Sequence, residues 1–498
     1  MKLLLVPLDE RPITYTYPQM VAAVAGQEVI MPPRAMMGSL QKAANSQDLI
    51  NFCQNAIKQG EVDAALICLD SLLYGGLITS RRTDATVKDI SARLDQIKKF
   101  KSLSREPLPI YVQSAIMRIS DNYDNTEEKD YWARYGRELF EWSTCLHRLA
   151  KRESIAPGLL ESLERRIPQD IRQDYLDTRF RNFTINQAVL KSVEDGSFDY
   201  AVFSQDDSGA FGLNVSEKER LESMTRNASL EKRINIYAGA DEVLLSMISR
   251  FLSDRAARAN GKRFVIDTRY AVPEVEQVAS RYEGQSIGTT IEAQIKAAGM
   301  IRRDATPDAA QADLLLIVHG GLEKQGDHIT LPGLPDLSQL DTQKSVKATM
   351  AEIEAATLPV VLVDLAYANG ADPLLMQALI ADKPASNKII GFAGWNTSGN
   401  TVGSALALAA AYLFGQKAGV PRQKEALNRC LFTRLVDDYA YQSLARKTLN
   451  GDPSTQKLAE AIAPTIKQVA RFLDMEPPVR LSFPWKRTFE IEIGFEGG

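Results

Sequence analysis

The chain has 498 residues, of which 45% are hydrophobic and 24% are charged, and its formal net charge at pH 7 is −4. These values are typical of a globular protein, and the slightly acidic balance argues against nucleic acid as the main partner, because phosphate binding needs a basic field. No apolar run approaches the roughly 20 residues that span a bilayer, and the apolar start at 1–6 is too short for a signal peptide. We therefore expect a cytoplasmic protein that binds neither nucleic acid nor a membrane.

Nine short apolar runs predict buried strands along the chain. They lie near residues 2–7, 64–69, 109–113, 199–204, 234–238, 263–267, 313–318, 359–364 and 388–393. Amphipathic helical stretches separate most of these runs, and alternating strands and helices predict a mainly parallel sheet. The predicted fold class is therefore α/β, either a (β/α) barrel or a related parallel α/β core such as a doubly wound sheet.

Two regions depart from this alternation. The segment at about 129–195 is rich in charge and in helix formers, which predicts a helical insertion within a catalytic core that spans residues 1–420. Residues 421–475 are again helical in pattern, and the tail beyond them alternates apolar and polar residues. We expect residues 421–498 to form C-terminal helices with a short β extension.

Cysteine and histidine are scarce. The four cysteines are far apart and form no CxxC pair, and the chain has only three histidines. This pattern is typical of reduced thiols in a cytosolic protein, and it argues against zinc sites and against Ser-His-Asp catalysis. We expect no metal and no cofactor, so carboxylates, together with Arg, Tyr, Asn and Lys side chains, must carry any catalysis.

Acidic residues follow most of the predicted strands. Those at or just after strand ends are Asp9, Asp70, Asp206, Asp207, Asp241, Glu242, Asp267 and Asp364. In α/β sheets, ligands bind at the carboxyl ends of the strands. We therefore expect these carboxylates to line one shared polar site.

The first two motifs combine carboxylates with arginine and an aromatic ring. Asp9 and Arg11 lie in PLDERP, where proline on both sides makes the turn rigid, and Arg11 could clamp an anionic or hydroxylated ligand. Asp70, Tyr74 and Arg81 lie in LDSLLYGGLITSR, where two glycines permit a close approach to a ligand. The alternatives are an Asp–Arg pair within the first turn and a helix cap at Asp70.

The motif SQDDSG contains the strongest acid–base candidates. Asp206 and Asp207 are adjacent at a strand end, and like charges so close together raise the pKa of one carboxyl group. Asp241 and Glu242, in YAGADE, could bind substrate in the same way. Alternatively, Asp241 caps the next helix and Glu242 lies in its first turn.

Two later loops are rich in carboxamides. Asn369 lies in LAYANGAD, and Trp395, Asn396 and Asn400 lie in GWNTSGNT. Amide groups can both donate to and accept from sugar hydroxyls, and the indole offers a face on which a pyranose ring can stack. The Thr/Ser/Asn-rich start of the following helix could also be an ordinary cap or an anion site.

The motifs PLDERP, YGGLITSR, QDDSG, GWNTSGNT and FPWKRTFEI together resemble the bacterial family catalogued as domain of unknown function 4127. The resemblance covers residues 1–498, and it brings no established activity to these residues. Adjacent aspartates followed by a later Trp-Asn loop are also similar to glycosidases that use substrate-assisted catalysis on N-acetylated sugars.

Our leading hypothesis is a carbohydrate-active enzyme, a glycosidase that acts on a sugar or a related small molecule. In it, Asp207 is the general acid/base and Asp206 orients the substrate or is the partner carboxylate. The residues expected to bind the substrate are Asp9, Arg11, Asp70, Tyr74, Arg81, Asp241, Glu242, Asn369, Trp395, Asn396 and Asn400. One alternative is a divalent-metal-dependent enzyme acting on phosphorylated or acidic small molecules, and another is a non-enzymatic binding protein.

Overall fold

The computed structural model describes residues 1–498 except 41, 207, 304–310, 330–335, 478–479 and 496–498. The chain forms two compact units. The first consists of Met1–Glu10, Glu28–Leu244 and Tyr282–Gly284, and the second of Arg11–Gln27, Leu245–Arg281 and Gln285–Gly498. The chain therefore passes between the units several times.

The first unit is built on a six-stranded parallel sheet with the order β2-β1-β3-β4-β5-β6. Its strands are β1 (Lys2–Val6), β2 (Glu28–Ile30), β3 (Ala64–Cys68), β4 (Ile110–Ile116), β5 (Tyr200–Gln205) and β6 (Ile234–Ala238). The central strands β3, β4 and β5 are buried along their whole length, as expected of parallel strands covered on both faces. Burial on both faces gives these strands continuous apolar sequences, and this pattern allowed them to be predicted.

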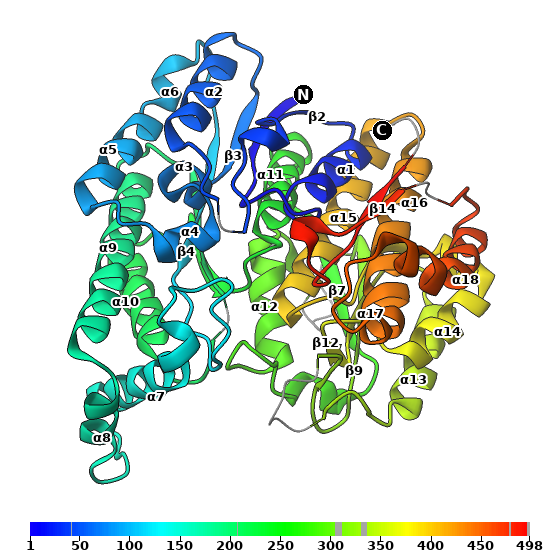
Figure 1. Ribbon diagram of the computed structural model, residues 1–498. Coiled ribbons are helices and arrows are strands. Elements are labelled where there is room, and N and C mark those ends of the chain that lie inside the picture. Colours follow the sequence, from blue (N-terminus) through cyan, green and yellow to red (C-terminus); the bar gives the residue numbers. More distant parts are fainter. Residues whose placement is uncertain (41, 207, 304–310, 330–335, 478–479, 496–498) are drawn as a thin grey trace. The chain divides into compact units, whose positions relative to one another are not determined.

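Helices surround this sheet within the first unit. They are η1 (Arg34–Met36), α2 (Ser46–Lys58), α3 (Leu69–Tyr74), α4 (Leu77–Arg82), α5 (Val87–Lys98), α6 (Phe100–Leu103), α7 (Trp132–Ala150), α8 (Leu159–Arg166), α9 (Gln169–Glu194) and α10 (Leu213–Asn227). Figure 1 shows α7 and α8 at the opposite end of this unit from α2 and α6. The segment between β4 and β5 thus contains α7, α8 and α9. Residues of all three helices and of the stretch after β4 form an apolar cluster that includes Trp132 and Trp142.

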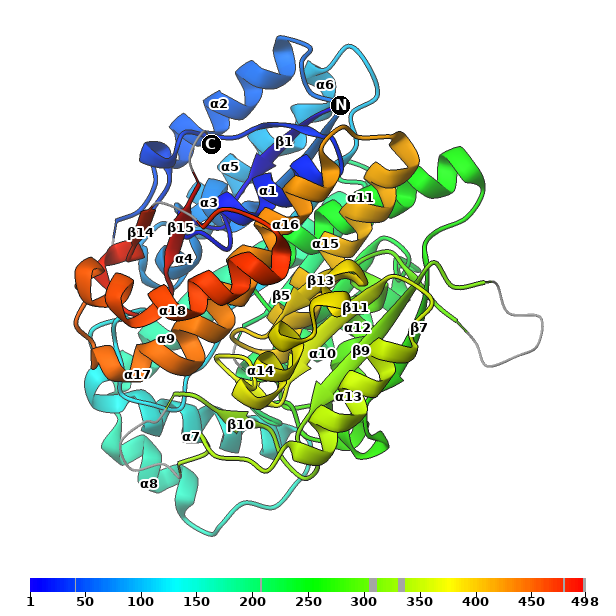
Figure 2. The ribbon, with the colours of Figure 1, turned by 90° about the vertical axis from the view of Figure 1, so that its right-hand side faces the viewer.

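The second unit contains a five-stranded parallel sheet with the order β13-β11-β9-β7-β8. Its strands are β7 (Val265–Tyr270), β8 (Ile301–Arg302), β9 (Leu314–Gly320), β11 (Val360–Leu365) and β13 (Ile389–Ala393). Two small sheets accompany it, formed by β10 (Gly326–Asp327) with β12 (Tyr367–Ala368) and by β14 (Arg480–Ser482) with β15 (Glu492–Gly494). Figure 2 shows β13, β11, β9 and β7 side by side, with α13 and α14 in front of them.

The helices of the second unit are more numerous. They are α1 (Thr16–Val24), most of α11 (Val243–Asn260), η2 (Pro273–Gln277), α12 (Ile287–Ala297), α13 (Gln343–Ala355), α14 (Pro373–Ala381), η3 (Lys383–Asn387), α15 (Ser398–Ala418), α16 (Gln423–Arg434), η4 (Leu435–Ala445), α17 (Arg446–Leu449), α18 (Thr455–Leu473) and η5 (Pro484–Lys486). The helix α15 is buried almost throughout and packs on β11 and β13, because small residues let it approach the sheet closely. The element η4 is a π-helix that continues α16.

The predicted α/β fold with parallel sheets is confirmed, and each of the nine predicted runs overlaps a strand. The position expected for Asp267 at a strand end is wrong. The strand β7 continues to Tyr270, so Asp267 lies within it, paired in register with Leu315 and 3.7 Å from Arg269. In the part of the chain that the structure describes, no helix combines the length and the apolar character needed to cross a bilayer.

Candidate functional site

The carboxyl edge of the six-stranded sheet gathers acidic residues from four strands. Asp9 follows β1, Asp70 follows β3, Asp206 comes directly after β5, and Asp241 with Glu242 follows β6. In the strand order these strands lie within one continuous stretch of the sheet. All these side chains are buried or nearly so, and Asp206 is the most accessible of them, with 18% of its side chain exposed. The structure thus brings these five predicted residues to one edge of one sheet.

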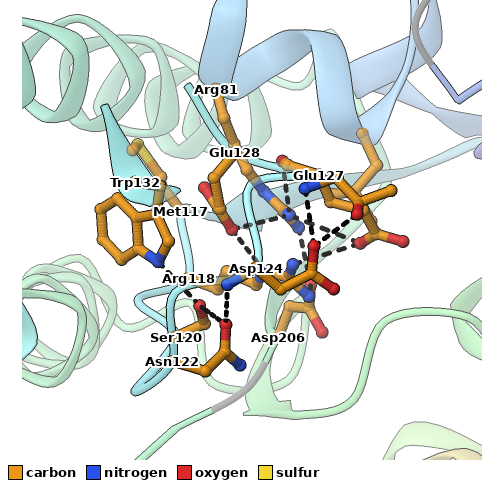
Figure 3. Close-up of polar contacts among 12 residues, drawn as sticks. Arg81, Met117, Arg118, Ser120, Asn122, Asp124, Glu127, Glu128, Trp132 and Asp206 are labelled. Carbon is orange, nitrogen blue, oxygen red and sulfur yellow. Dashed lines mark hydrogen bonds and ion pairs between the residues drawn. The ribbon is translucent and has the colours of Figure 1, made fainter. Parts of the chain in front are cut away.

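A buried arginine organises this edge. Arg81, with 1% of its side chain exposed, lies 2.7 Å from Asp206 Oδ2, 3.2 Å from Glu128 Oε1 and 3.8 Å from Glu127 Oε2. A second arginine, Arg118, lies 2.7 Å from Glu128, 3.2 Å from Glu127 and 3.7 Å from Asp206. Figure 3 shows the two guanidinium groups and the three carboxylates interleaved. Each buried charge has opposite charges beside it. Their attraction offsets the cost of removing these charges from water.

The local sequence explains how Arg81 reaches the edge. The helix α3 ends at Gly75, which has a φ of +84°, and α4 begins after Gly76, which has a φ of +141°. A Cβ atom at Gly75 would lie 2.7 Å from the carbonyl oxygen of Ala44. Glycine is therefore required at this turn, and the turn sends α4, with Arg81, back across the strand ends.

Asp70 has the most strongly altered acidity at this edge. Burial raises its pKa to about 6, although the backbone N–H of Ala115, 2.9 Å away, and the nearby Gln113 and Arg81 stabilise its charged form. A carboxyl group with this pKa exchanges its proton near neutral pH, which is a requirement for general acid–base catalysis.

Two more carboxylates approach the end of β3. Burial raises the pKa of the Cys68 thiol, and the negative charges of Asp70, Asp9 and Glu242 raise it further. Ser71 donates hydrogen bonds to the carbonyl oxygens of Pro7 and Leu8, at 2.6 and 2.8 Å, which fastens the turn that carries Asp9 to α3. The edge therefore concentrates negative charge around β3.

Glu242 owes its position to a glycine. Gly239 has a φ of +143°, and a Cβ atom there would lie 2.2 Å from Glu242 Oε1. The carboxyl group of Glu242 thus packs directly against Gly239, where any larger side chain would contact it. The side chain of Glu242 is fully buried.

Sequence reasoning missed Arg118, Glu127 and Glu128. Arg118 comes two residues after β4, so it obeys the strand-end rule, but that rule was applied to acidic residues alone. Glu127 and Glu128 precede α7 in a charged stretch that resembles a solvated helix start, and the sequence gives no local signal of their burial.

Tyr74 and Asp207 complete the predicted residues of the first unit. Tyr74 is buried, and the guanidinium of Arg181 lies 5.6 Å from its ring centroid. Burial and the charge of Asp70 raise the pKa of Tyr74 well above its usual range. Asp207 lies outside the described residues, so the geometry of the Asp206–Asp207 pair stays a prediction.

The remaining predicted residues belong to the second unit. Arg11 lies 3.8 Å from Glu490 and 5.3 Å from the ring centroid of Trp485. Asn369 has a φ of +59° and donates to Asp327 Oδ1 at 3.0 Å, and its backbone N–H donates to Asn396. Asparagine tolerates this left-handed conformation, and the two hydrogen bonds hold the residue in place.

The aromatic residue predicted to stack on a sugar is covered in this unit. Trp395 is 3% exposed, and its ring makes an edge contact with Phe489 at 5.6 Å. Asn400 is buried in the first turn of α15, where Thr397 is the capping residue. The predicted residues therefore form two groups, one associated with each large sheet, instead of one group on a single sheet.

A second polar network lies at the carboxyl edge of the five-stranded sheet. His319, at the end of β9, lies 3.0 Å from Asp372 and 2.8 Å from Thr349. Asp364, in β11, accepts from the backbone N–H of Asp372 at 2.6 Å, and burial raises the pKa of Asp364 to about 6. Burial acts to raise the pKa of Asp372, but His319 lowers it below its usual range.

The π-helix η4 adds a buried ion cluster to this network. Arg434 lies 2.9 Å from Asp437 and 3.1 Å from Asp438, and Asp438 accepts from the backbone N–H of Gly394 at 2.8 Å. Burial raises the pKa of Asp438 to about 7. Within the described ranges, no cluster of three or more His, Cys, Asp or Glu side chains has an arrangement that could hold a metal ion.

Comparison with known proteins identifies the family. The family model described as protein of unknown function, DUF4127, matches residues 3–494. The chain belongs to this family. No curated protein matches the sequence. The resemblance inferred from the five motifs is thus confirmed, and two of those motifs supply Arg81 and Asp206, the buried ion pair of the six-stranded sheet.

Proposed function

We propose that the protein is a glycosidase whose acid and base are carboxyl groups at the carboxyl edge of the six-stranded sheet. The observation that supports this proposal is the contrast between two aspartates at that edge. Asp70 is buried and has a pKa of about 6, whereas Asp206 is partly exposed and held by two arginines. Two carboxyl groups in different environments can divide the roles of acid and base.

We propose an inverting mechanism, with which the strand order is compatible. Asp70 follows β3 and Asp206 follows β5, and only β4 lies between these strands. Adjacent strands are about 4.8 Å apart, so the two strand ends are separated by about 10 Å. Inverting glycosidases place their carboxyl groups about 6.5–9.5 Å apart to leave room for a water molecule, whereas retaining enzymes need about 5–5.5 Å.

The proposed roles follow from acidity and access. Asp70, protonated below about pH 6, donates its proton to the leaving oxygen, and Asp206 accepts a proton from the attacking water. Arg81 and Arg118 hold the carboxylate of Asp206 in one orientation. Asp207 was expected to be the general acid/base, and the proposal moves the acid to Asp70 because Asp70 has the raised pKa.

A panel of chromogenic glycosides, including N-acetylated sugars, tests the proposal. Asp70→Asn and Asp206→Asn should each lower kcat by about 100-fold or more, the usual scale for an acid–base group. The matched control is Asp267→Asn, since Asp267 lies within β7 and has only a 3.7 Å contact with Arg269. The first-formed sugar product should have inverted configuration by NMR. Near-normal turnover in both edge variants would refute the proposal.

Chelation distinguishes the proposal from the alternative of a metal-dependent enzyme. Carboxyl groups alone can protonate the leaving group and activate water, so we expect EDTA to leave turnover unchanged. A loss of turnover that Mg²⁺ or Mn²⁺ restores would instead favour metal-assisted chemistry on a phosphorylated substrate. Thermal stabilisation by one sugar, without any turnover, would favour a binding protein.

A further inference from the structure

The loop 208–212 connects the residues after β5 to α10, and a distant segment of the first unit holds its beginning. The backbone N–H of Ser208 donates to the carbonyl oxygen of Tyr282 at 2.6 Å. Gly284 packs so closely that a Cβ atom there would lie 2.5 Å from the carbonyl oxygen of Gly209. The position of this loop therefore depends on contacts from outside it.

The end of the loop is held by α7. His147 Nδ1 accepts a hydrogen bond from the backbone N–H of Gly212 at 3.2 Å, and Ser143 Oγ accepts one from Leu213 at 2.7 Å. Both side chains of α7 are buried. The first N–H groups of a helix have no partner within it, so His147 and Ser143 serve as the cap of α10.

The residue at the start of α10 cannot provide this cap itself. Gly212 has a φ of +155°, and a Cβ atom there would lie 2.5 Å from Asn214 Oδ1. A capping residue with a side chain, such as serine or aspartate, is therefore excluded at this position, and the acceptor must come from elsewhere.

The hydrogen bond from Gly212 selects one tautomer of a neutral His147 ring. An imidazole nitrogen that accepts a hydrogen bond carries no proton, so the single proton of neutral His147 lies on Nε2, which faces Glu219 at 3.5 Å. A second proton would convert Nδ1 from an acceptor into a donor that faces another donor.

The charged neighbours of His147 come from both helices. Glu219 of α10 also pairs with Lys151 of α7 at 2.7 Å. The guanidinium of Arg148 lies 4.6 Å from the ring centroid of Phe211, and this ring lies 5.7 Å from the imidazole. Phe211 of the loop is thus packed between two side chains of α7.

We propose that neutral His147 is a positioning residue that locks the loop 208–212 beside Asp206, and that protonation of His147 releases this loop. A proton on Nδ1 would face the N–H of Gly212, so the ring can hold the loop only while this nitrogen is an acceptor. The consequence for catalysis rests on the proposed function, whereas the release of the loop does not.

Hydrogen exchange tests the release without any substrate. In the wild-type protein, the protection factors of the Gly212 and Leu213 amides should fall by about tenfold between pH 7.5 and pH 5.5, the scale of one lost hydrogen bond. Protection factors, and not raw rates, are compared because they correct for the pH dependence of intrinsic exchange. An unchanged protection factor in the wild type would by itself overturn the proposal.

Two variants assign the effect to His147. In His147→Asn, the side-chain oxygen can replace Nδ1 as acceptor but does not titrate, so protection should stay constant over this pH range. His328→Asn, which changes a histidine of the second unit, should behave like the wild type. An equal fall in His147→Asn would show that another group releases the loop.

Turnover of the Asp206→Asn variant, compared with the hydrogen-exchange result, separates this proposal from the proposed function. If the loop is released but Asp206→Asn retains full turnover, the assignment of catalysis to this edge is wrong and the lock stands. If turnover depends on Asp206 but the amides keep their protection at pH 5.5, the lock is wrong and the catalytic assignment stands.

Discussion

The two large sheets place the same kinds of residue at their carboxyl edges but in different surroundings. At the edge of the six-stranded sheet, Asp206 and Arg118 keep 18% and 15% of their side chains exposed. At the edge of the five-stranded sheet, Arg434, Asp437 and Asp438 are each 3% exposed or less. Solvent can therefore reach Asp206 and Arg118 at the first edge, whereas Arg434, Asp437 and Asp438 of the second edge are enclosed by protein.

This difference separates a site from a structural network. Carboxylates of the second edge accept hydrogen bonds from backbone N–H groups. Asp438 accepts one from Gly394, and Asp364 accepts one from Asp372. Asp438 joins the residue after β13 to the π-helix η4, and Asp364 joins β11 to Asp372, the capping residue of α14. A carboxylate after a strand thus indicates a polar edge. Asp70 is as buried as the carboxylates of the second edge, so the difference between the edges rests on the partly exposed Asp206 and Arg118.

The largest expected effect tests the structural character of the second edge. Arg434→Met removes the counter-ion of Asp437 and Asp438, and leaving buried charges uncompensated costs about 3–5 kcal/mol. Urea unfolding at pH 7.5 measures this loss. Arg429→Met is the matched control, because Arg429 is 37% exposed and pairs with the exposed Glu425, a pair worth less than about 1 kcal/mol. Equal stabilities of the two variants would contradict the comparison.

A smaller effect comes from the pH dependence of the same network. Asp438 has a pKa of about 7 in the folded protein, above its usual range because of burial. The folded state therefore binds this proton more tightly than the unfolded chain does, so stability from Asp438 is present at low pH and is lost as the pH rises towards about 7.

The Asp438→Asn variant has no carboxyl group at this position, so it should not lose this stability as the pH rises. The free energy of unfolding of the variant, relative to the wild type, should increase by on the order of 2 kcal/mol between pH 4.5 and pH 8. Denaturant unfolding of both proteins at these two pH values measures the change. A constant difference would show that Asp438 keeps its charge throughout, and the second edge would then resemble an ordinary ion pair.

The smallest expected effect concerns Trp395. Its indole N–H is buried and donates no hydrogen bond to any residue that the structure describes. Trp395→Phe should therefore cost about 1 kcal/mol, from lost ring volume alone, and should leave KM for any sugar unchanged. A rise in KM of tenfold or more would restore Trp395 to the substrate site and would weaken the distinction between the two edges.

The sequence predicted the strands because both sheets are buried on both faces and their strands read as apolar runs. It did not predict that the strands divide into a sheet of six and a sheet of five, since strand partners are set by contacts distant in the chain. The short strands β2, β8, β10 and β12 have two or three residues each, too few to form a recognisable pattern.

The candidate site was predictable only in part. The strand-end rule led to Asp70 and Asp206, and it failed at Asp267 because β7 extends three residues beyond that aspartate. The rule could not reveal that Arg81 pairs with Asp206, because 125 residues separate them and only the folded sheet brings them together. The raised pKa of Asp70 arises from burial by the whole unit, which no local motif encodes.

The most direct test of the central claim is the pH profile of kcat/KM for the wild type and for Asp70→Asn on a glycoside that the enzyme cleaves. If Asp70 is the general acid, wild-type kcat/KM falls as the pH rises through about 6, since the carboxyl group loses the proton that it must donate. In Asp70→Asn, kcat/KM should be reduced by about 100-fold or more, and the fall near pH 6 should be absent. An Asp70→Asn enzyme with wild-type kcat/KM and an unchanged profile would contradict the account.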